Sequence, residues 1–462
     1  MSPKDKIPTS RVRRSAKVGR LAAGQAARQL GTKTANLARS DEAANVALEK
    51  RQVEAAEQIV AALGTMKGAA MKLGQVMSFL DVGLVPEPYR EEFQRKLGEL
   101  RDAAPKVRFE DMRKVIESDL EEPLEDTFES FEEEPIAAAS IGQVYRATLR
   151  DDGREVAVKV QYPGVAQAVR ADMQNLGIIL RLMKRVAPGI DVKAIGEEVR
   201  ARIYEELDYE LEAQNQRSMA RIYRGHPFIV IPDVLTRLSR ERVIVQEFVS
   251  GRGFEELKRL PQDERDRIGE IVFRFFFGSL YRHRQFSGDP HPGNFLLLDD
   301  GRMAFLDFGL FKRMSDEAVE FELTCQRAYI DGDGETLMRL FVEHGFISDP
   351  KRFTPEGLMA QIDDSTWWWS RDETVALDPG IATKIAIEMS DPRSSHFHQM
   401  RHESLPSEHL FARRVEMLTM AVLSQLRARG NFHRIALEWI TGAPPATELG
   451  EQEALFYARA AA

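Results

Sequence analysis

The stretch Asp289-Pro290-His291-Pro292-Gly293-Asn294 decides how the chain is interpreted, together with Asp307-Phe308-Gly309 downstream. Asp289 and Asn294 lie five residues apart, which is the spacing of a loop that transfers phosphoryl groups. In such a loop the aspartate accepts the proton of an attacking hydroxyl or orients a water, and the asparagine ligates Mg²⁺. Asp307 follows a strand-like run, and its carboxylate is a hard oxygen donor of the kind that Mg²⁺ prefers. The two segments predict a magnesium-dependent nucleotide site.

Three segments upstream supply the parts that would hold a nucleotide. The run 137–144 is a strand-turn-strand pattern with small residues at its tip, which lets backbone N–H groups approach phosphates. Lys159 lies in a valine-rich strand pattern, where a charge needs a partner or a ligand. Glu212, in a helical pattern, is the predicted partner of this lysine. Three nearby glutamates are rivals for that role: Glu205, Glu206 and Glu210.

The five segments occur in the order and spacing of a kinase-type ATP site. We therefore predict an α+β, bilobal, protein-kinase-like fold with ATP or ADP and Mg²⁺ as cofactors. Asp289, Lys159 and Glu212 are the predicted catalytic residues, and the predicted metal ligands are Asn294 and Asp307. The predicted nucleotide-binding residues are Ala137, Ala138, Ala139, Ser140, Gly142, Val144, Lys159, Gln246 and Phe248.

The pattern of apolar and turn residues predicts the elements around these segments. β-Branched runs over 136–149 and 155–161 flank the hairpin signal Asp151-Asp152-Gly153. A helical pattern covers 109–120, and further helices are predicted over 165–187 and 191–224. The other predicted strands are 228–232, 242–248, 295–298 and 303–306. We divide the chain into a basic, disordered tail (1–40), a helical extension (41–125), a kinase-like N-lobe (126–250), a C-lobe with the catalytic and metal loops (251–340) and a helical region (341–462).

Composition narrows the class of protein. The 462 residues carry a formal net charge of −9, which argues against general nucleic-acid binding by the folded body. No run of about 18 apolar residues occurs, so we predict no transmembrane helix. Cys325 is the single cysteine, which rules out an internal disulfide framework and fits a reducing compartment. A cytoplasmic location is therefore expected.

Two motifs outside the kinase parts carry a family resemblance. Lys72-Leu73-Gly74-Gln75 and Glu206-Leu207-Asp208 match the KxGQ and ExD motifs of the ABC1/UbiB/COQ8 (ADCK) atypical kinases. The alanine-rich run 137–144, and Ser287-Gly288-Asp289 in place of His-Arg-Asp, also resemble that family. The resemblance covers about residues 55–330. It implies that the extension folds over the catalytic cleft and that four residues are regulatory: Lys72, Gln75, Glu206 and Asp208.

The resemblance also implies an activity. It suggests a magnesium-dependent ATPase or kinase that supports isoprenoid quinone or other lipid metabolism at a membrane surface. No Ala-Pro-Glu element follows Asp307, and no arginine stands directly before Asp289 to receive a regulatory phosphate. Protein phosphorylation is therefore not expected. The implied partners are a nucleotide, a lipid or small-molecule substrate, a peripheral membrane contact and a second copy in a homodimer.

Alternatives remain at several positions. The loop at Asp289 also resembles that of aminoglycoside and choline phosphotransferases, so a soluble small-molecule phosphotransferase is one alternative, and a nucleotide-gated scaffold is another. Residues 1–39 carry ten Lys/Arg against one acid, so three interpretations stay open: a solvated tail, which is favoured, an anchor to anionic lipid, or a nucleic-acid contact. The run 367–369, three tryptophans, is either core or a membrane contact, and core is favoured. Zinc is disfavoured at four histidines in a predicted loop: His396, His398, His402 and His409.

Overall fold

A computed structural model describes residues 107–381 and 406–461, apart from positions 140, 172, 174–176, 178–179, 181–195, 198–199 and 201–202. The predicted tail, most of the predicted extension, Lys72, Gln75 and Ser140 lie outside these residues, as do His396, His398 and His402. The chain forms two compact units. The described part of the first comes from 107–210 and Leu235–Gln246, and that of the second from Leu211–Val234 and from Glu247 onward.

The first unit is built on a five-stranded sheet in the order β1-β3-β4-β6, with β2 paired to β3. Along β3 the side chains of Tyr145 and Leu149 are buried, whereas those of Val144 and Arg146, on either side of Tyr145, are partly exposed. This alternation is typical of a sheet that is covered on one face. Helix α5 places Phe109 at 5.7 Å from the Tyr145 ring. The bounds are α5 Phe109–Leu120, α6 Leu124–Thr127, β1 Phe128–Phe131, β2 Ala137–Ala138, β3 Gly142–Leu149, β4 Glu155–Gln161 and β6 Val243–Glu247. The predicted hairpin and the predicted helix over 109–120 are confirmed.

The helix predicted over 191–224 is wrong in one respect, because it is interrupted at Leu207. Helix α9 begins afresh as Tyr209–Ile222. The N–H of Tyr209 donates to the carbonyl of Glu241 at 3.0 Å and not to a preceding helical turn. A hydrogen bond to a distant segment thus separates the two helices at the ExD motif. The periodicity of apolar residues cannot predict such a contact.

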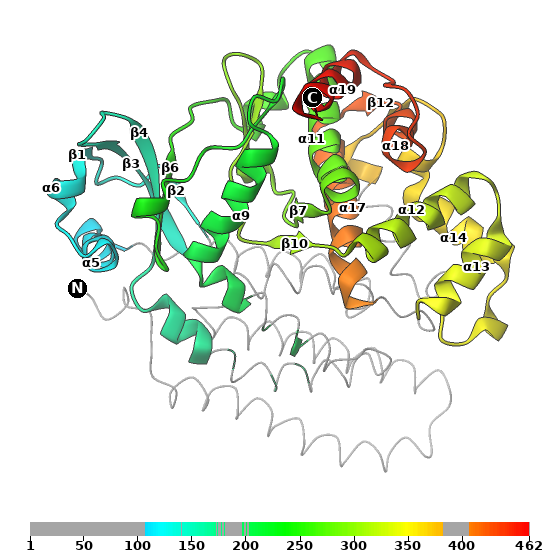
Figure 1. Ribbon diagram of the computed structural model, residues 1–462, viewed down its shortest axis with the longest axis horizontal. Helices are drawn as coiled ribbons and strands as arrows, with labels where there is room; N and C mark the ends of the chain where they lie inside the picture. Colours follow the sequence, from blue (N-terminus) through cyan, green and yellow to red (C-terminus); the bar gives the residue numbers. More distant parts are fainter. Residues whose placement is uncertain are drawn as a thin grey trace, which may run out of the picture. The chain divides into compact units, whose positions relative to one another are not determined.

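The core of the second unit forms around helix α11 (Gln262–His283), which lies against α17 (Ser407–Leu426) and α18 (Phe432–Ile440) (Figure 1). Nearly every side chain from Ile268 to Tyr281 is buried, as expected for a helix that is apolar on all faces. The other helices are α10 Phe254–Leu257, α12 Asp316–Ile330, α13 Gly334–Glu343, α14 Pro355–Ser370 and α19 Glu448–Ala461.

Three small sheets complete the second unit. Strand β9 pairs in parallel with β5 and antiparallel with β8, which confirms the hairpin predicted over 295–306. Strand β7 pairs antiparallel with β10, and β11 pairs antiparallel with β12. The bounds are β5 Ile229–Val230, β7 Gln285–Ser287, β8 Phe295–Leu297, β9 Met303–Phe305, β10 Phe311–Arg313, β11 Val375–Ala376 and β12 Arg429–Gly430.

The tryptophan run belongs to the core, as predicted. Trp368 and Trp369 are each 1% exposed, and Trp367 packs against the same cluster from a partly buried position. The indole N–H of Trp369 donates to the carboxylate of Glu416 at 2.8 Å. These side chains are therefore not a membrane contact. His409 also departs from its prediction, because it lies in helix α17 and not in a loop.

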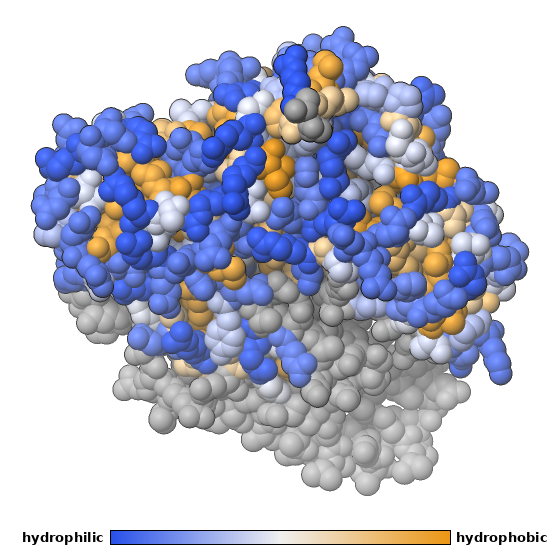
Figure 2. Space-filling model, in the orientation of Figure 1, coloured by the Kyte–Doolittle hydropathy of each residue, from blue (hydrophilic) through white to orange (hydrophobic). Residues whose placement is uncertain are grey.

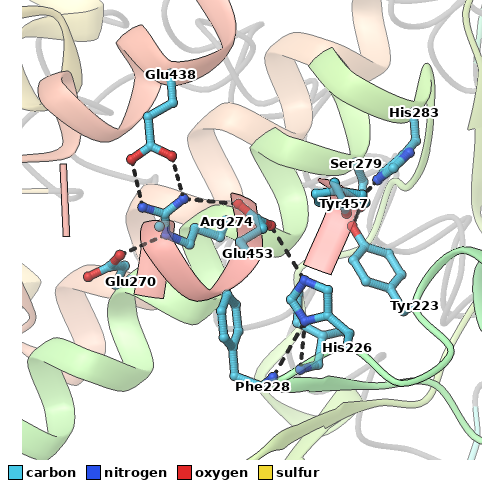
Figure 3. A network of polar contacts seen from close by, with 12 residues as sticks. Tyr223, His226, Phe228, Glu270, Arg274, Ser279, His283, Glu438, Glu453 and Tyr457 are labelled. Atoms are coloured by element: carbon cyan, nitrogen blue, oxygen red, sulfur yellow. Dashed lines mark hydrogen bonds and ion pairs between the residues drawn. The ribbon is translucent and has the colours of Figure 1, made fainter. Parts of the chain in front are cut away.

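A buried ionic network joins α19 to α11 (Figure 3). The Arg274 guanidinium, 0% exposed, bonds Glu270 of its own helix, Glu438 of α18 and Glu453 of α19. Glu453 in turn lies 3.6 Å from His226. A second link pairs His283 and Tyr457 at 2.8 Å. The C-terminal helix is thus fixed by charge as well as by apolar packing.

The surface of the described residues is mainly hydrophilic, and hydrophobic residues appear on the visible face as separate patches (Figure 2). Within the described ranges, six large apolar side chains are exposed: Ile136, Tyr204, Ile330, Val342, Met417 and Leu455. Among the described residues, no helix combines the length and the apolar character that crossing a membrane requires.

Candidate active site

One row of the first unit's sheet gathers three predicted nucleotide residues. Ala137 pairs with Val144 across β2 and β3, and Val144 pairs with Lys159 across β3 and β4. Directly paired residues project to the same face of a sheet. The small residue, the apolar residue and the lysine therefore share one face. Ala138, the neighbour of Ala137, is exposed.

The turn after β2 is tight. The N–H of Ala139 donates to the carbonyl of Gly142 at 2.9 Å, and the N–H of Gly142 donates to the carbonyl of Ala139 at 3.5 Å. A Cβ on Gly142 would lie 2.2 Å from the carbonyl oxygen of Val160 and 2.9 Å from the Tyr209 hydroxyl. No side chain fits there. The one glycine left in this alanine-rich run is therefore required by close contact of two strands and α9.

Tyr209 was not predicted as a site residue. The Lys159 ammonium lies 5.1 Å from the centre of its ring, within the range of a cation–π contact. Tyr209 thus borders both the turn glycine and the predicted phosphate lysine. Its one sequence signal is its position immediately after the ExD motif, and the chemistry of a tyrosine there does not by itself indicate a site.

The second unit carries the predicted catalytic loop. The Asn294 amide nitrogen donates to the Asp289 carboxylate at 3.4 Å and to the Asp289 carbonyl at 3.3 Å. This leaves the amide oxygen of Asn294 as the atom suited to a metal. His291 caps the turn between them by accepting from the N–H of Gly293 at 3.1 Å. The spacing read from the sequence therefore brings the two polar side chains together.

Hydrogen bonds tie the predicted catalytic loop to the predicted metal loop. Ser287 and Phe311 face each other in the β7–β10 pair. The Ser287 hydroxyl donates to the Asp307 carbonyl at 3.2 Å. The N–H of Leu306 donates to the Asn294 carbonyl at 2.8 Å. Asp289, Asn294 and Asp307 are thus held on one frame within the second unit.

Two carboxylates flank Gly309. A Cβ on this glycine would lie 3.2 Å from Glu212 Oε2 and 3.4 Å from Asp307 Oδ1. The Asp307 carboxylate accepts from the N–H of Gly309 at 2.9 Å, and Glu212 is 4% exposed. Asn215, one turn after Glu212, donates to the carbonyl of Phe308 at 3.4 Å. Helix α9 therefore contacts the Asp-Phe-Gly segment directly.

Arg414 is a second residue that sequence reasoning missed. Its Nη2 lies 3.2 Å from Asp289 Oδ1, and its Nε donates to the carbonyl of Gly288 at 3.0 Å. It belongs to α17, more than a hundred residues further along the chain. No local pattern connects an arginine at that distance with the loop.

The other predicted residues differ in exposure. Glu206 is 7% exposed and Asp208 is exposed, so the two acids of the ExD motif lie in different environments. Among the rivals of Glu212, Glu210 is exposed and Glu205 is partly buried. Gln246 lies in β6, and Phe248 follows that strand; both are partly buried.

The donor set fits a magnesium ion held with a nucleotide. The described residues contain no group of three or more His, Cys, Asp or Glu arranged as a metal site. Mg²⁺ commonly takes one or two protein oxygens and completes its shell with waters and substrate phosphates. The Asp307 carboxylate and the Asn294 amide oxygen are such a pair, on loops that are bonded to each other.

Comparison with known proteins identifies the family. The family model for the ABC1 atypical kinase-like domain matches residues 99–341. The chain belongs to the ABC1 atypical kinase family. The match confirms the resemblance seen in the sequence, and with it the α+β protein-kinase-like fold.

ABC1 relatives occur in several organisms. The atypical kinase COQ8B, mitochondrial, of Rattus norvegicus is 32% identical over 72% of this chain and 63% of its own length. The atypical kinase coq-8, mitochondrial, of Caenorhabditis elegans is 30% identical over 75% of this chain and 46% of its own length. The Mycobacterium tuberculosis protein Rv3197, solved with erythromycin, is 30% identical with a TM-score of 0.62, over 87% of this chain and 98% of its own. The chain thus spans less than two thirds of the length of the two COQ8-type relatives.

Proposed function

We propose that the protein binds Mg²⁺·ATP and transfers or hydrolyses the γ-phosphoryl group. The observation that carries this proposal lies in the second unit, where hydrogen bonds join the loop of Asp289 and Asn294 to the segment that carries Asp307. These are the residue types and the order that phosphoryl transfer requires. ADP binds the same residues as the product.

Each residue has a role in this proposal. Asn294 and Asp307 hold Mg²⁺, which supplies charge neutralisation at the phosphates when it is bound. Asp289 orients the attacking water or hydroxyl and accepts its proton. Lys159 contacts the α- and β-phosphates, and Glu212 is its assigned partner. Residues of the alanine run, with Gln246 and Phe248, complete the nucleotide contacts.

Protein phosphorylation is not part of the proposal. Helix α12 begins at Asp316, directly after β10, and Ser315 caps it by accepting from the N–H of Ala318. This leaves no long activation segment after Gly309 to form a platform for a protein substrate or to receive a regulatory phosphate.

The substrate class rests on the family. We propose that turnover supports isoprenoid quinone or other lipid metabolism at a membrane surface, with the protein bound peripherally and otherwise cytoplasmic. We also propose that turnover is restrained by Lys72, Gln75, Glu206 and Asp208, and that the protein assembles as a homodimer.

The soluble aminoglycoside- or choline-kinase alternative is not favoured by the family match. The nucleotide-gated scaffold remains as the alternative if turnover is absent.

The test is ATP hydrolysis by the purified protein with Mg²⁺, with and without anionic liposomes and quinone-precursor phenols. We expect hydrolysis that either addition stimulates, and at least a hundredfold loss in Asp307→Asn. Asp300→Asn is the matched control, since Asp300 sits in an exposed turn nearby. Full turnover in Asp307→Asn would refute the proposal, and phosphorylation of an added aminoglycoside without any liposome effect would support the soluble alternative.

A further inference from the structure

The catalytic aspartate is held from two sides. Asp289 Oδ1 lies 3.2 Å from Nη2 of Arg414, and Asp289 Oδ2 accepts from the Asn294 amide at 3.4 Å. Nε of the same guanidinium donates to the backbone carbonyl of Gly288, one residue earlier, at 3.0 Å. The Arg414 and Asp289 side chains are 14% and 18% exposed. One rigid, planar group thus fixes both a carbonyl and a carboxylate of the loop.

The same helix explains the glycine before Asp289. A Cβ on Gly288 would lie 3.2 Å from the Phe411 ring and 3.3 Å from Leu310. Helix α17 therefore lies close against the backbone here, and a large side chain at 288 would displace it. The arginine that protein kinases carry at this position is absent, and an arginine from α17 reaches the aspartate instead.

Helix α17 is itself anchored by a buried ionic cluster next to Arg414. Glu322 of α12, 1% exposed, accepts from His409 at 2.7 Å and pairs with Arg413. Arg413 also bonds Glu416 at 3.0 Å. Burial raises the pKa of the Glu322 carboxyl, but the facing Arg413 and His409 hold that pKa below its usual range. The cluster fixes α17 in rotation, so that Arg414 points at the loop.

We propose that Arg414 is a positioning residue, which holds the Asp289 carboxylate in the orientation that phosphoryl transfer needs. This inference rests on the proposed function. The contacts of Arg414 to the loop are to the Asp289 carboxylate and the Gly288 carbonyl, so we assign it a role through Asp289. Its loss should therefore slow turnover without weakening the binding of Mg²⁺·ATP, because small misplacements of a catalytic group cost up to about a hundredfold in rate.

The experiment compares Arg414→Ala, Arg414→Lys and the control Arg434→Ala, whose guanidinium is exposed and pairs with Asp372. The measurements are kcat and KM for Mg²⁺·ATP, the melting temperature, and rescue by added guanidinium. Arg414→Ala is then combined with Asp289→Ala. We expect Arg414→Ala to lower kcat 10- to 100-fold with KM changed less than threefold, partial recovery with guanidinium, and no further loss in the double variant.

The outcomes separate this inference from the proposed function. A wild-type kcat in Arg414→Ala overturns the inference alone. A loss shared by kcat, KM and melting temperature without rescue shows a structural role and also overturns it. A loss in the double variant equal to the product of the two single losses shows that Arg414 does not act through Asp289. If the wild type itself fails to hydrolyse ATP, the proposed function fails and the inference falls with it.

Discussion

At the scale of the residue, the site depends on a few atoms at close quarters. The Asp-Phe-Gly segment matters because its Gly309 lies between two carboxylates, that of Asp307 in the segment itself and that of Glu212 on α9. The alanine run matters for a different reason. Alanine adopts positive φ less readily than glycine, so we expect Ala139 to restrict how closely the turn can approach a phosphate.

The first prediction concerns nucleotide preference. Ala139→Gly should change the ratio of ATP to ADP affinity by several-fold, because a more permissive turn can approach the γ-phosphate. The two dissociation constants, measured by calorimetry with Mg²⁺, check this. An unchanged ratio would contradict it.

The second prediction concerns Gly142. Gly142→Ala should destabilise the protein by about 1–3 kcal/mol or more, since a Cβ there would meet a backbone oxygen at 2.2 Å. Denaturant unfolding measures the change. Gly253→Ala is the control, because Gly253 has φ −79° and nothing lies within 4 Å of its Cβ position. Equal stability of the two variants would be inconsistent with the described turn.

At the scale of the element, the sequence predicts what is local. The hairpin around Gly153, the strand pair around Gly301, and the Asp289–Asn294 loop follow from turn chemistry and spacing. The break at Leu207 does not, because a carbonyl from a distant segment causes it. Arg414 and Tyr209 escaped prediction for the same reason: their partners are close in space and remote in sequence.

The third prediction concerns how α19 is fixed to α11. Arg274→Met should cost about 3–5 kcal/mol of unfolding free energy, because it removes the shared cation of the buried Glu453 and of the partly buried Glu270 and Glu438. Limited proteolysis should then release the C-terminal helix first. Arg302→Met, at an exposed pair, is the control and should change stability by less than about 1 kcal/mol. An unchanged free energy of unfolding in Arg274→Met would show that the network does not stabilise the protein.

At the scale of the whole molecule, stability should depend on pH through the buried His226 and the partly buried His283. Burial, with the nearby Arg282 and His226, lowers the pKa of His283 to about 4, against the opposing charge of Glu453; burial also lowers the pKa of His226. An unfolded imidazole takes up its proton near pH 6.5. Between about pH 6.5 and 4 the unfolded chain therefore binds more protons, so the free energy of unfolding falls as the pH falls.

The fourth prediction tests this window. The melting temperature should drop steadily from pH 7 to pH 4.5, and His283→Gln should make that drop shallower, because it removes one of the titrating groups. Melting followed by circular dichroism at several pH values measures both slopes. Identical slopes in the variant and the wild type would show that His283 does not titrate on unfolding.

We infer that the second unit's two loops hold a magnesium-bound nucleotide. Calorimetric titration of ATP into the purified protein, with Mg²⁺ and then with excess EDTA, tests it most directly. We expect one site per chain, at least tenfold weaker binding in EDTA, and a similar loss of affinity in Asp307→Asn with Mg²⁺ present. Equal affinity with and without Mg²⁺, or unchanged affinity in Asp307→Asn, would contradict it.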